Sequence, residues 1–134
     1  MERDYSTTPL AKKLGVAPAM TVAAIGAPPG AVAQLGSLPS GCRVVTRMSK
    51  DVDLILWWPT SRAELARRAP ALASATGTAG LWILWAKRSS GVVSEVTEQA
   101  VRETGLLTGL VDNKVAAFDQ TWSALRFVPR RRPS

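Results

Sequence analysis

Three short apolar runs, each bounded by glycine or proline, constrain the fold of this chain more than any other feature. They are Thr21–Gly26, Asp53–Trp58 and Leu81–Ala86. Apolar residues occupy nearly all successive positions in each run, so both faces of a strand formed there would be buried. Such runs are typical of parallel β-strands covered on both sides of the sheet. Each run is also far shorter than the roughly 20 residues that a membrane-spanning helix requires. We therefore expect no membrane partner.

Two further segments have strand patterns of a different kind. Arg43–Met48 carries more polar residues, which favours a place nearer the edge of the sheet. Between Val111 and Val128, apolar residues alternate with other residues on both sides of a turn near Asp119. This alternation predicts an antiparallel hairpin at a sheet edge.

The start of one helix is marked by a capping box. Ser61 and Glu64 have the S-x-x-E spacing in which each side chain accepts a hydrogen bond from a free backbone N–H of the first turn. The helix is predicted to run from there toward Thr76. Pro70 lies inside it and predicts a kink or a break, because proline removes a backbone donor and clashes with the preceding turn.

Other helices are predicted from their flanking residues. Pro9–Gly15 and Gly30–Leu38 predict short helices, and a polar first turn predicts a longer one over Ser94–Thr104. Strands that alternate with helices imply a mostly parallel sheet covered on both faces. The predicted fold class is therefore α/β, with a Rossmann-like, mostly parallel sheet, helices on both faces and an antiparallel C-terminal edge hairpin. We expect a flexible arm over residues 1–8, a single domain over 9–128 and a basic tail over 129–134.

The cysteine and histidine content excludes several kinds of chemistry. Cys42 is the only cysteine and the chain has no histidine. An intramolecular disulfide, a Cys/His catalytic pair and a zinc site of Cys and His ligands are therefore impossible. The ten carboxylates are scattered, and no metal site is predicted from them. Residues 1–5 are polar and lack the apolar stretch of a signal peptide, so the expected location is the cytoplasm.

The formal net charge of +7 comes partly from a short run at the end of the chain, Arg130, Arg131 and Arg132. Such a run can bind phosphates without reading a nucleic-acid sequence. Together with Lys12 and its neighbour Lys13, the tail leaves open a partner such as nucleic acid or the ribosome. The alternative is a solvated tail that aids solubility.

The segment Lys87–Gly91 is the strongest candidate for a binding loop. It follows a predicted strand and contains two cations, two hydroxyl groups and a glycine: Lys87, Arg88, Ser89, Ser90 and Gly91. A helix N-terminus, which favours anions, is expected directly after it. The loop therefore predicts a small phosphate-bearing ligand, unless it is an ordinary connection with solvent-facing charges. Its serines have no histidine to activate them, so no catalytic residue is assigned.

The first strand is followed by a loop that superficially resembles a glycine-rich nucleotide-binding loop. It begins at Gly26 and ends at Gly30, but Pro28 and Pro29 stand in its middle and supply no backbone N–H. The carboxylate that would hold a ribose after the second strand is also missing, and Arg47 stands in that region instead. S-adenosylmethionine therefore remains a possible cofactor with two of its usual contacts absent, and otherwise no cofactor is expected.

The strand tryptophans are predicted to pack in the core. Trp58 is the exception, because it lies at the carboxyl end of its strand, where ligands bind in open parallel sheets. We include it with Gly26 among the candidate binding residues.

Several segments resemble a small bacterial family that is known only as domain of unknown function 3052. They are Tyr5–Gly15, Ser61–Leu65, Trp85–Val92 and Thr121–Ser123, in matching order along nearly the whole chain. The resemblance implies a shortened relative of the class I methyltransferase sheet. In that scheme the hairpin between residues 111 and 128 supplies the last two strands, one of them antiparallel.

Three hypotheses follow for the function. The leading one is a non-enzymatic module that binds an anionic ligand or partner through the Lys87–Gly91 loop. The first alternative is a reduced S-adenosylmethionine-dependent methyltransferase-like enzyme that uses the Gly26–Gly30 loop. The second alternative is a basic protein that associates with nucleic acid or the ribosome.

Overall fold

The apolar runs assemble into one six-stranded sheet with the strand order β2-β1-β3-β4-β6-β5. The structure is a computed structural model that describes residues 9–77 and 79–130. The first four strands pair in parallel with one another, and β6 pairs antiparallel with both of its neighbours, β4 and β5. This arrangement confirms the predicted fold class. The strands are β1 (Thr21–Ile25), β2 (Arg43–Val45), β3 (Leu54–Trp57), β4 (Leu81–Ala86), β5 (Val111–Ala117) and β6 (Trp122–Val128).

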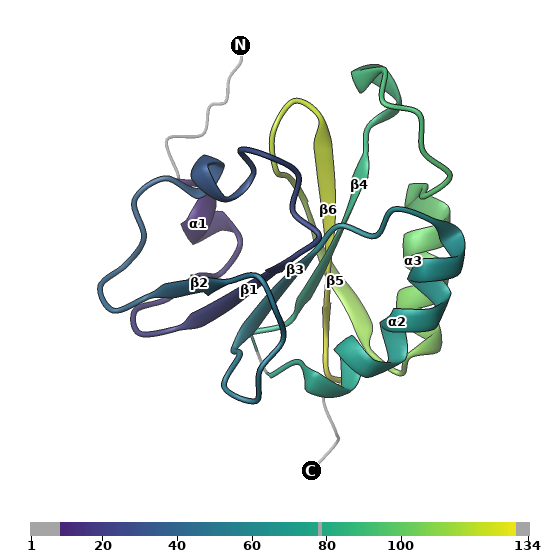
Figure 1. Cartoon of the computed structure of the whole chain (residues 1–134). Helices are drawn as coiled ribbons and strands as arrows, with labels where there is room; N and C mark the ends of the chain where they lie inside the picture. The colour runs from purple at the N-terminus through teal and green to yellow at the C-terminus, as the bar shows by residue number, and fades with distance from the viewer. Residues whose placement is uncertain (1–8, 78, 131–134) are drawn as a thin grey trace.

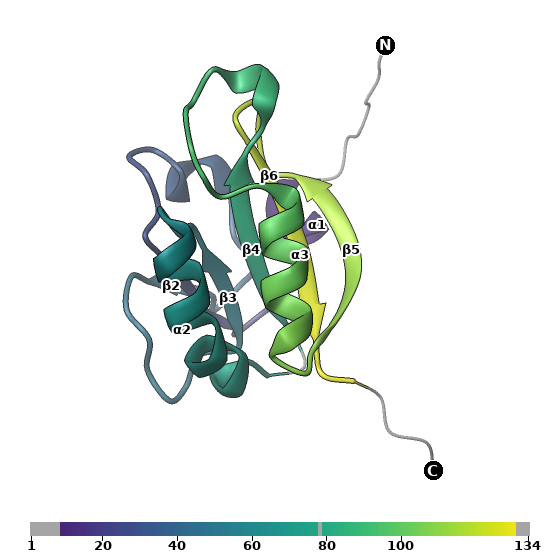
Figure 2. The same ribbon diagram turned by 90° about the vertical axis from the view of Figure 1, so that its right-hand side faces the viewer.

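Helices cover both faces of the sheet, as predicted, but unevenly. Helices α2 (Arg62–Ala75) and α3 (Glu98–Leu107) lie side by side on one face (Figures 1 and 2). The other face is covered by the short helix α1 (Leu10–Lys13) and the 3-10 turn η1 (Val32–Leu35). The helix predicted over Gly30–Leu38 is therefore reduced to a single turn. Among the described helices, none is long and apolar enough to cross a membrane.

Two cores form because successive strand residues point to opposite faces. On the α2/α3 face, Trp57 and Ile83 pack with helix residues such as Leu65. On the α1 face, Trp82 packs with Leu14, and the indole Nε1 of Trp82 donates a hydrogen bond of 2.8 Å to the Leu14 carbonyl. The tryptophans at positions 57, 58, 82 and 85 are all buried, as the sequence predicts for most of them.

Strand β1 is covered without any long helix of its own. The connection to β2 runs over the α1 face through η1, where Leu35 is buried. The connection from β2 back to β3 runs over the α2/α3 face, where Val52 is buried and Met48 packs partly. Strand β2 therefore ends at Val45 rather than at Met48. Residues 46–52 are needed to cross β1, because β2 and β3 lie on opposite sides of it.

The two long helices begin with hydroxyl caps. The Ser61 hydroxyl accepts a 3.0 Å hydrogen bond from the Glu64 amide, which confirms half of the predicted capping box. The Glu64 carboxylate accepts instead from the amide of Thr60, at 2.8 Å. Helix α2 continues through Pro70 without a break. Helix α3 begins at Glu98 rather than Ser94.

Candidate functional site

The topology identifies one edge of the sheet as the place for a ligand. The chain leaves β1 toward β2 on one side, and it leaves β3 toward β4 on the other. The carboxyl ends of β1 and β3 thus border a topological switch point, where open α/β sheets bind ligands in the crevice between diverging connections. Gly26 follows β1 and Trp58 follows β3, so two of the predicted site residues meet there.

The Gly26–Trp58 junction is tight. The Trp58 amide donates to the Ile25 carbonyl at 2.9 Å. Gly26 has φ +73°, and a Cβ added to it would lie 2.9 Å from the Trp58 carbonyl oxygen. Position 26 therefore requires glycine for two reasons: the left-handed backbone and the close approach of the next strand.

The prediction that Trp58 is available to a ligand is wrong. Its side chain is 2% exposed and lies edge-on against Phe118, with the ring centroids 5.4 Å apart. A residue at the end of a strand still alternates between faces, and this one points into the α1-face core. The buried indole nitrogens of Trp57 and Trp58 have no hydrogen-bond partner among the described residues.

The loop after β1 presents its backbone to solvent. Gly30 has φ +83°, and the space where its Cβ would lie is open. Within residues 9–77 and 79–130, the amides of Ala27 and Gly30 have no hydrogen-bond partner. Pro28 and Pro29 lack this donor. The loop thus offers two backbone donors beside a strand end.

The neighbouring strand end contributes cations rather than carboxylates. Arg47 and Lys50 are exposed after β2. Asp53 lies at the opposite edge, where its carboxylate accepts a 2.8 Å hydrogen bond from the Thr21 amide at the start of β1. This carboxylate therefore lies at the amino end of the parallel strands, away from the switch point.

Lys87 is occupied by a structural contact. Its ammonium donates to the Asp119 carbonyl and its amide to the Thr121 carbonyl, both at 2.8 Å. Lys87 thereby fastens the end of β4 to the turn between β5 and β6. Asp119 closes that turn by accepting from the amides of Thr121 and Trp122, as expected for a turn residue.

The rest of the predicted anion loop folds on itself. Residues Arg88–Ser90 form the 3-10 turn η2, and Gly91 ends it with φ +80°. The Ser90 hydroxyl donates to the Lys87 carbonyl and accepts from the Val92 amide. Ser89 and Arg88 are exposed. The expected helix N-terminus does not follow here, because residues 91–97 are irregular and α3 starts only at Glu98. The predicted anion site required the helix N-terminus to lie directly after the Lys87–Gly91 loop, and the structure contradicts that requirement.

A cleft of about 900 Å³ lies beside this loop, over the first turn of α3 and the β5–β6 hairpin. Trp85 and Ser123 come from strands β4 and β6, Val115 from the edge strand β5, and Val92 and Val96 from the irregular segment. The segment that contains Val92 rises beyond the end of β4 (Figure 2). Lys87 and Arg88 line the same cleft; Ser89, Ser90 and Gly91 do not.

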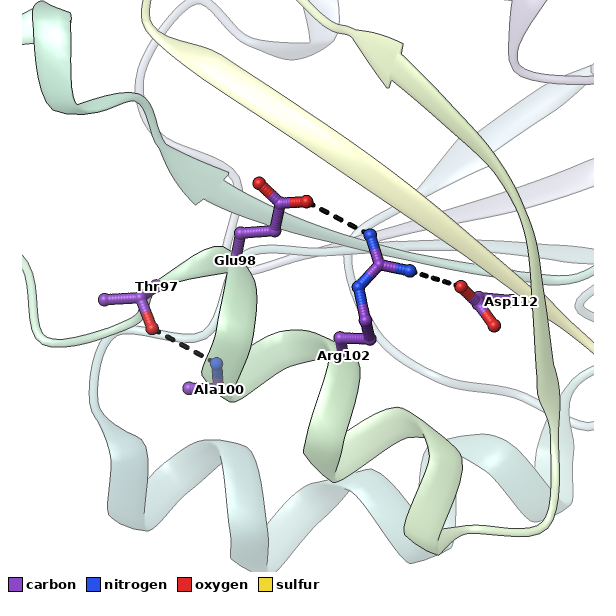
Figure 3. Close-up of polar contacts among 5 residues, drawn as sticks. All are labelled: Thr97, Glu98, Ala100, Arg102 and Asp112. Carbon is purple, nitrogen blue, oxygen red and sulfur yellow. Dashed lines mark hydrogen bonds and ion pairs between the residues drawn. The ribbon is translucent and has the colours of Figure 1, made fainter.

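Arg102 is a residue of this cleft that the sequence argument missed. Its guanidinium lies between the carboxylates of Glu98 and Asp112 (Figure 3). The Glu98–Arg102 spacing of i,i+4 is visible in the sequence, but the partner on β5 is not. Asp112 thereby joins α3 to the hairpin. The Thr97 hydroxyl caps the same helix by accepting from the Ala100 amide at 3.1 Å.

Lys12 lies apart from the other predicted site residues. It is exposed on α1 and lines a smaller hollow of about 480 Å³ together with residues such as Val16 and Leu38. The structure therefore brings Gly26 and Trp58 together, places Lys87–Gly91 at the next strand end, and separates Lys12 from both. The described residues contain no cluster of three metal-ligating side chains. Arg131 and Arg132 lie outside the described residues.

Comparison with solved structures finds similar folds among enzymes. A S-adenosylmethionine-dependent methyltransferase from Aquifex aeolicus has a TM-score of 0.61 and 16% identity, over 88% of this chain and 86% of that one. Magnesium protoporphyrin IX methyltransferase from Synechocystis PCC 6803 also has a TM-score of 0.61, with 10% identity, over 90% of this chain and 74% of that one. LepI in complex with S-adenosylmethionine has a TM-score of 0.52 and 14% identity, over 97% of this chain and 50% of that one.

Comparison by sequence gives no relative. No family model matches the chain, and no curated protein matches it. The resemblance to domain of unknown function 3052 therefore remains a prediction.

The structural matches correct the leading functional hypothesis. A non-enzymatic anion-binding module is contradicted, because the similar structures include two methyltransferases and because the Lys87 ammonium already donates to the Asp119 carbonyl. The methyltransferase-like alternative accounts better for the findings. The chain has a methyltransferase-like Rossmann fold.

Proposed function

We propose that this protein is a reduced, S-adenosylmethionine-dependent methyltransferase-like enzyme. The observation that carries the proposal is the match of almost the whole chain to two methyltransferases at a TM-score of 0.61. The switch point between β1 and β3 gives this proposal a location, because the sheet opens there at the loop that begins with Gly26.

The residues at the switch point fit part of the cofactor. Gly30 leaves open space for close approach, and the amides of Ala27 and Gly30 are available as donors. These groups suit the polar atoms of a ligand that is held by backbone contacts. No carboxylate stands directly at the end of β2 to accept from ribose hydroxyls; Arg47 stands there, and the first carboxylate after the strand is Asp51. We therefore expect weaker binding than in a site with both contacts.

When bound, S-adenosylmethionine supplies an electrophilic methyl group on a sulfonium. The chain's own contribution is to hold the loop backbone through the Gly26–Trp58 junction and to place an acceptor nearby. We assign the acceptor to the cleft beside β4, because its volume of about 900 Å³ is of the size that small-molecule sites have. Its walls combine apolar groups, Trp85 and Val115, with the polar pair Glu98 and Arg102.

The test is calorimetric titration with S-adenosylmethionine and S-adenosylhomocysteine, together with thermal melts. Gly30→Leu places a side chain where the loop is open and should abolish the binding heat. Gly109→Leu is the matched control, because Gly109 also has a positive φ of +92° with open space around its Cβ position. Both variants carry similar backbone strain, but Gly109 lies in the turn between α3 and β5. Saturable binding in the parent and the Gly109 variant supports the proposal.

Absence of any heat at millimolar ligand, with a cooperative melt showing that the protein is folded, would overturn the proposal. Equal loss of binding in the two glycine variants would remove the Gly26–Gly30 loop as the site.

A further inference from the structure

The α1 face of the C-terminal hairpin carries a strip of cations, which we call the basic strip: Lys12, Lys13, Lys114 and Arg126. They come from α1, β5 and β6 and converge on the end of α1. The Lys114 ammonium donates to the Lys13 carbonyl at 3.1 Å. The Arg126 guanidinium lies 4.0 Å from the position of a Cβ on Gly15. Lys114 and Arg126 are also paired across the two strands and thus share a face.

The carboxylates of the described residues lie elsewhere. Glu98, Glu103 and Asp112 belong to the α2/α3 face, where Asp112 and Glu98 pair with Arg102. Glu64 is on α2, and Glu95 accepts from the amide of Arg62 at the start of the same helix. Asp119 is committed to its turn, Asp53 to the amino end of β1, and Asp51 lies in the connection between β2 and β3. Within residues 9–77 and 79–130, the ion pairs involve Arg68 and Arg102 and none of the strip cations.

The strip cations keep donors for a partner. Lys114 gives one of its ammonium hydrogens to the Lys13 carbonyl, and Arg126 gives its Nε hydrogen to the Ala79 carbonyl at 3.0 Å. Both η nitrogens of Arg126 remain, and Arg126 is only half-buried. Lys12 is exposed. Cations with a purely structural role would be expected to form ion pairs with carboxylates on this face. The described residues place no carboxylate beside the strip cations.

An aromatic side chain lies on the same face. Trp122 is two positions from Ala124 and four from Arg126 along β6, so all three point to the same side of the sheet. It is half-buried at the margin of the α1-face core. Cations beside a partly exposed indole are the two elements with which proteins hold single-stranded nucleic acid: phosphates on the cations and a base stacked on the ring.

We propose that the basic strip and Trp122 bind single-stranded nucleic acid across α1 and the β5–β6 hairpin. A lipid surface is the weaker candidate, because five of the six large exposed apolar side chains among the described residues lie away from the strip, and the sixth, Val32 on η1, is only 37% exposed. Val92 and Val93 are in the segment after β4, Leu106 and Leu107 on α3, and Val115 opposite Leu125 on the α2/α3 face. This inference is independent of the proposed function, since no residue of the strip belongs to the Gly26–Gly30 loop or lines the cleft beside β4.

The experiment is fluorescence anisotropy of the full chain with a labelled 12-nucleotide oligouridine at several salt concentrations. Lys12→Gln/Lys13→Gln should weaken binding at least tenfold at low salt. It should also reduce the slope of log affinity against log salt by about 1.4, because each phosphate contact on a single strand contributes about 0.7. The matched control is Arg62→Gln/Arg67→Gln on α2, which removes the same charge from exposed positions on the opposite face.

An equal loss of affinity in the control would show that net charge alone acts, and would overturn the proposal. So would the absence of binding to the oligonucleotide, or tighter binding to vesicles of anionic lipid than to RNA. The Trp122 contact has its own test, because Trp122→Leu should lower affinity at least fivefold while leaving the salt slope unchanged. Photo-crosslinking with 4-thiouridine RNA tests it without a core substitution: crosslinks in β6 or α1 support the strip, and crosslinks confined to α2 or α3 contradict it.

Discussion

The indole of Trp82 and the carbonyl of Leu14 are joined by a buried hydrogen bond of 2.8 Å across 68 residues of sequence. Trp82 lies in the fourth strand, and Leu14 ends the first helix. A helix of four residues has no stability by itself, because nucleation is unfavourable and few turns follow it. This contact, together with the burial of Leu14, explains how α1 can cover one face of the sheet.

The Trp82–Leu14 bond gives a matched pair of tryptophan variants. Trp82→Phe and Trp58→Phe each remove the same atoms from a buried position, but the Trp58 indole has no partner among the described residues. Trp82→Phe additionally leaves the Leu14 carbonyl buried without its donor. We expect it to lower the free energy of unfolding by about 1–2 kcal/mol more than Trp58→Phe does. Urea denaturation followed by far-ultraviolet circular dichroism measures the difference; equal losses would show that the bond contributes nothing net.

Gly105 in α3 faces the ring of Phe127. A Cβ there would lie 2.2 Å from two ring atoms, so Gly105→Ala should destabilise the protein by about 1–3 kcal/mol through overpacking. This direction is opposite to helix propensity, which favours alanine by about 1 kcal/mol. The neighbouring Thr104→Ala serves as control, and Phe127→Leu should reduce the penalty for alanine at 105. Thermal denaturation decides, and a stabilised Gly105→Ala protein would contradict the close packing.

Lys87 should act on stability rather than on ligand affinity. Lys87→Ala removes the hydrogen bond to the Asp119 carbonyl and is expected to cost about 1 kcal/mol of unfolding free energy. Arg88→Ala changes an exposed neighbour and should leave the melting temperature within experimental error. If both variants have the melting temperature of the parent protein, the hydrogen bond between Lys87 and the Asp119 carbonyl contributes nothing to stability.

The lowered pKa of Glu64 predicts that the stability of the protein depends on pH in the acidic range. Burial raises the pKa of Glu64, but hydrogen bonds from Thr60 and the charges of Arg68 and Arg67 together hold it below its ordinary value. A carboxylate with a lowered pKa in the folded state stabilises the protein above its unfolded pKa of about 4.5, and this contribution is lost as the pH falls through the folded value.

The comparison with Glu64→Gln measures this contribution. The melting temperature of the parent protein should exceed that of the variant at pH 7, and the difference should shrink below pH of about 4.5 and vanish in stronger acid. Thermal melts at pH 7, 5, 4 and 3 test it. A difference that is constant over this range would mean that the carboxylate charge is not what stabilises the helix start.

The strands were predictable because their evidence is local. Leu81–Ala86 begins and ends where the sequence predicts, since an unbroken apolar run between turn residues has few other places in a globular protein. The cap at Ser61 and the hairpin turn at Asp119 depend on contacts within a few residues and were also predictable. The ends of elements that depend on residues distant in the sequence were harder to predict. Strand β2 is shortened because the chain must cross β1, and α3 starts only at Glu98, after the irregular residues 91–97.

The candidate site was predicted less well than the fold. Gly26 was predicted as a binding residue, and the sequence could not show that the Trp58 carbonyl approaches the position of its Cβ. The Lys87–Gly91 loop has the composition of an anion site, but composition does not determine which donors remain free. Lys87 bonds to a carbonyl 32 residues later, and Arg102 finds its second carboxylate on another strand.

Apolar periodicity and turn residues act over a few positions, so they were enough to locate the strands, to predict which are buried and to assign the class of the sheet. The tertiary structure alone decided which polar groups are committed and which are left for a ligand. Trp58 is buried in the α1-face core, and the Lys87 ammonium donates to the Asp119 carbonyl. The Lys114 ammonium donates to the carbonyl of Lys13, 101 residues earlier in the sequence. Hydrogen bonds and charge pairs act over a few ångströms in space, so they depend on which distant segments the folded sheet brings together.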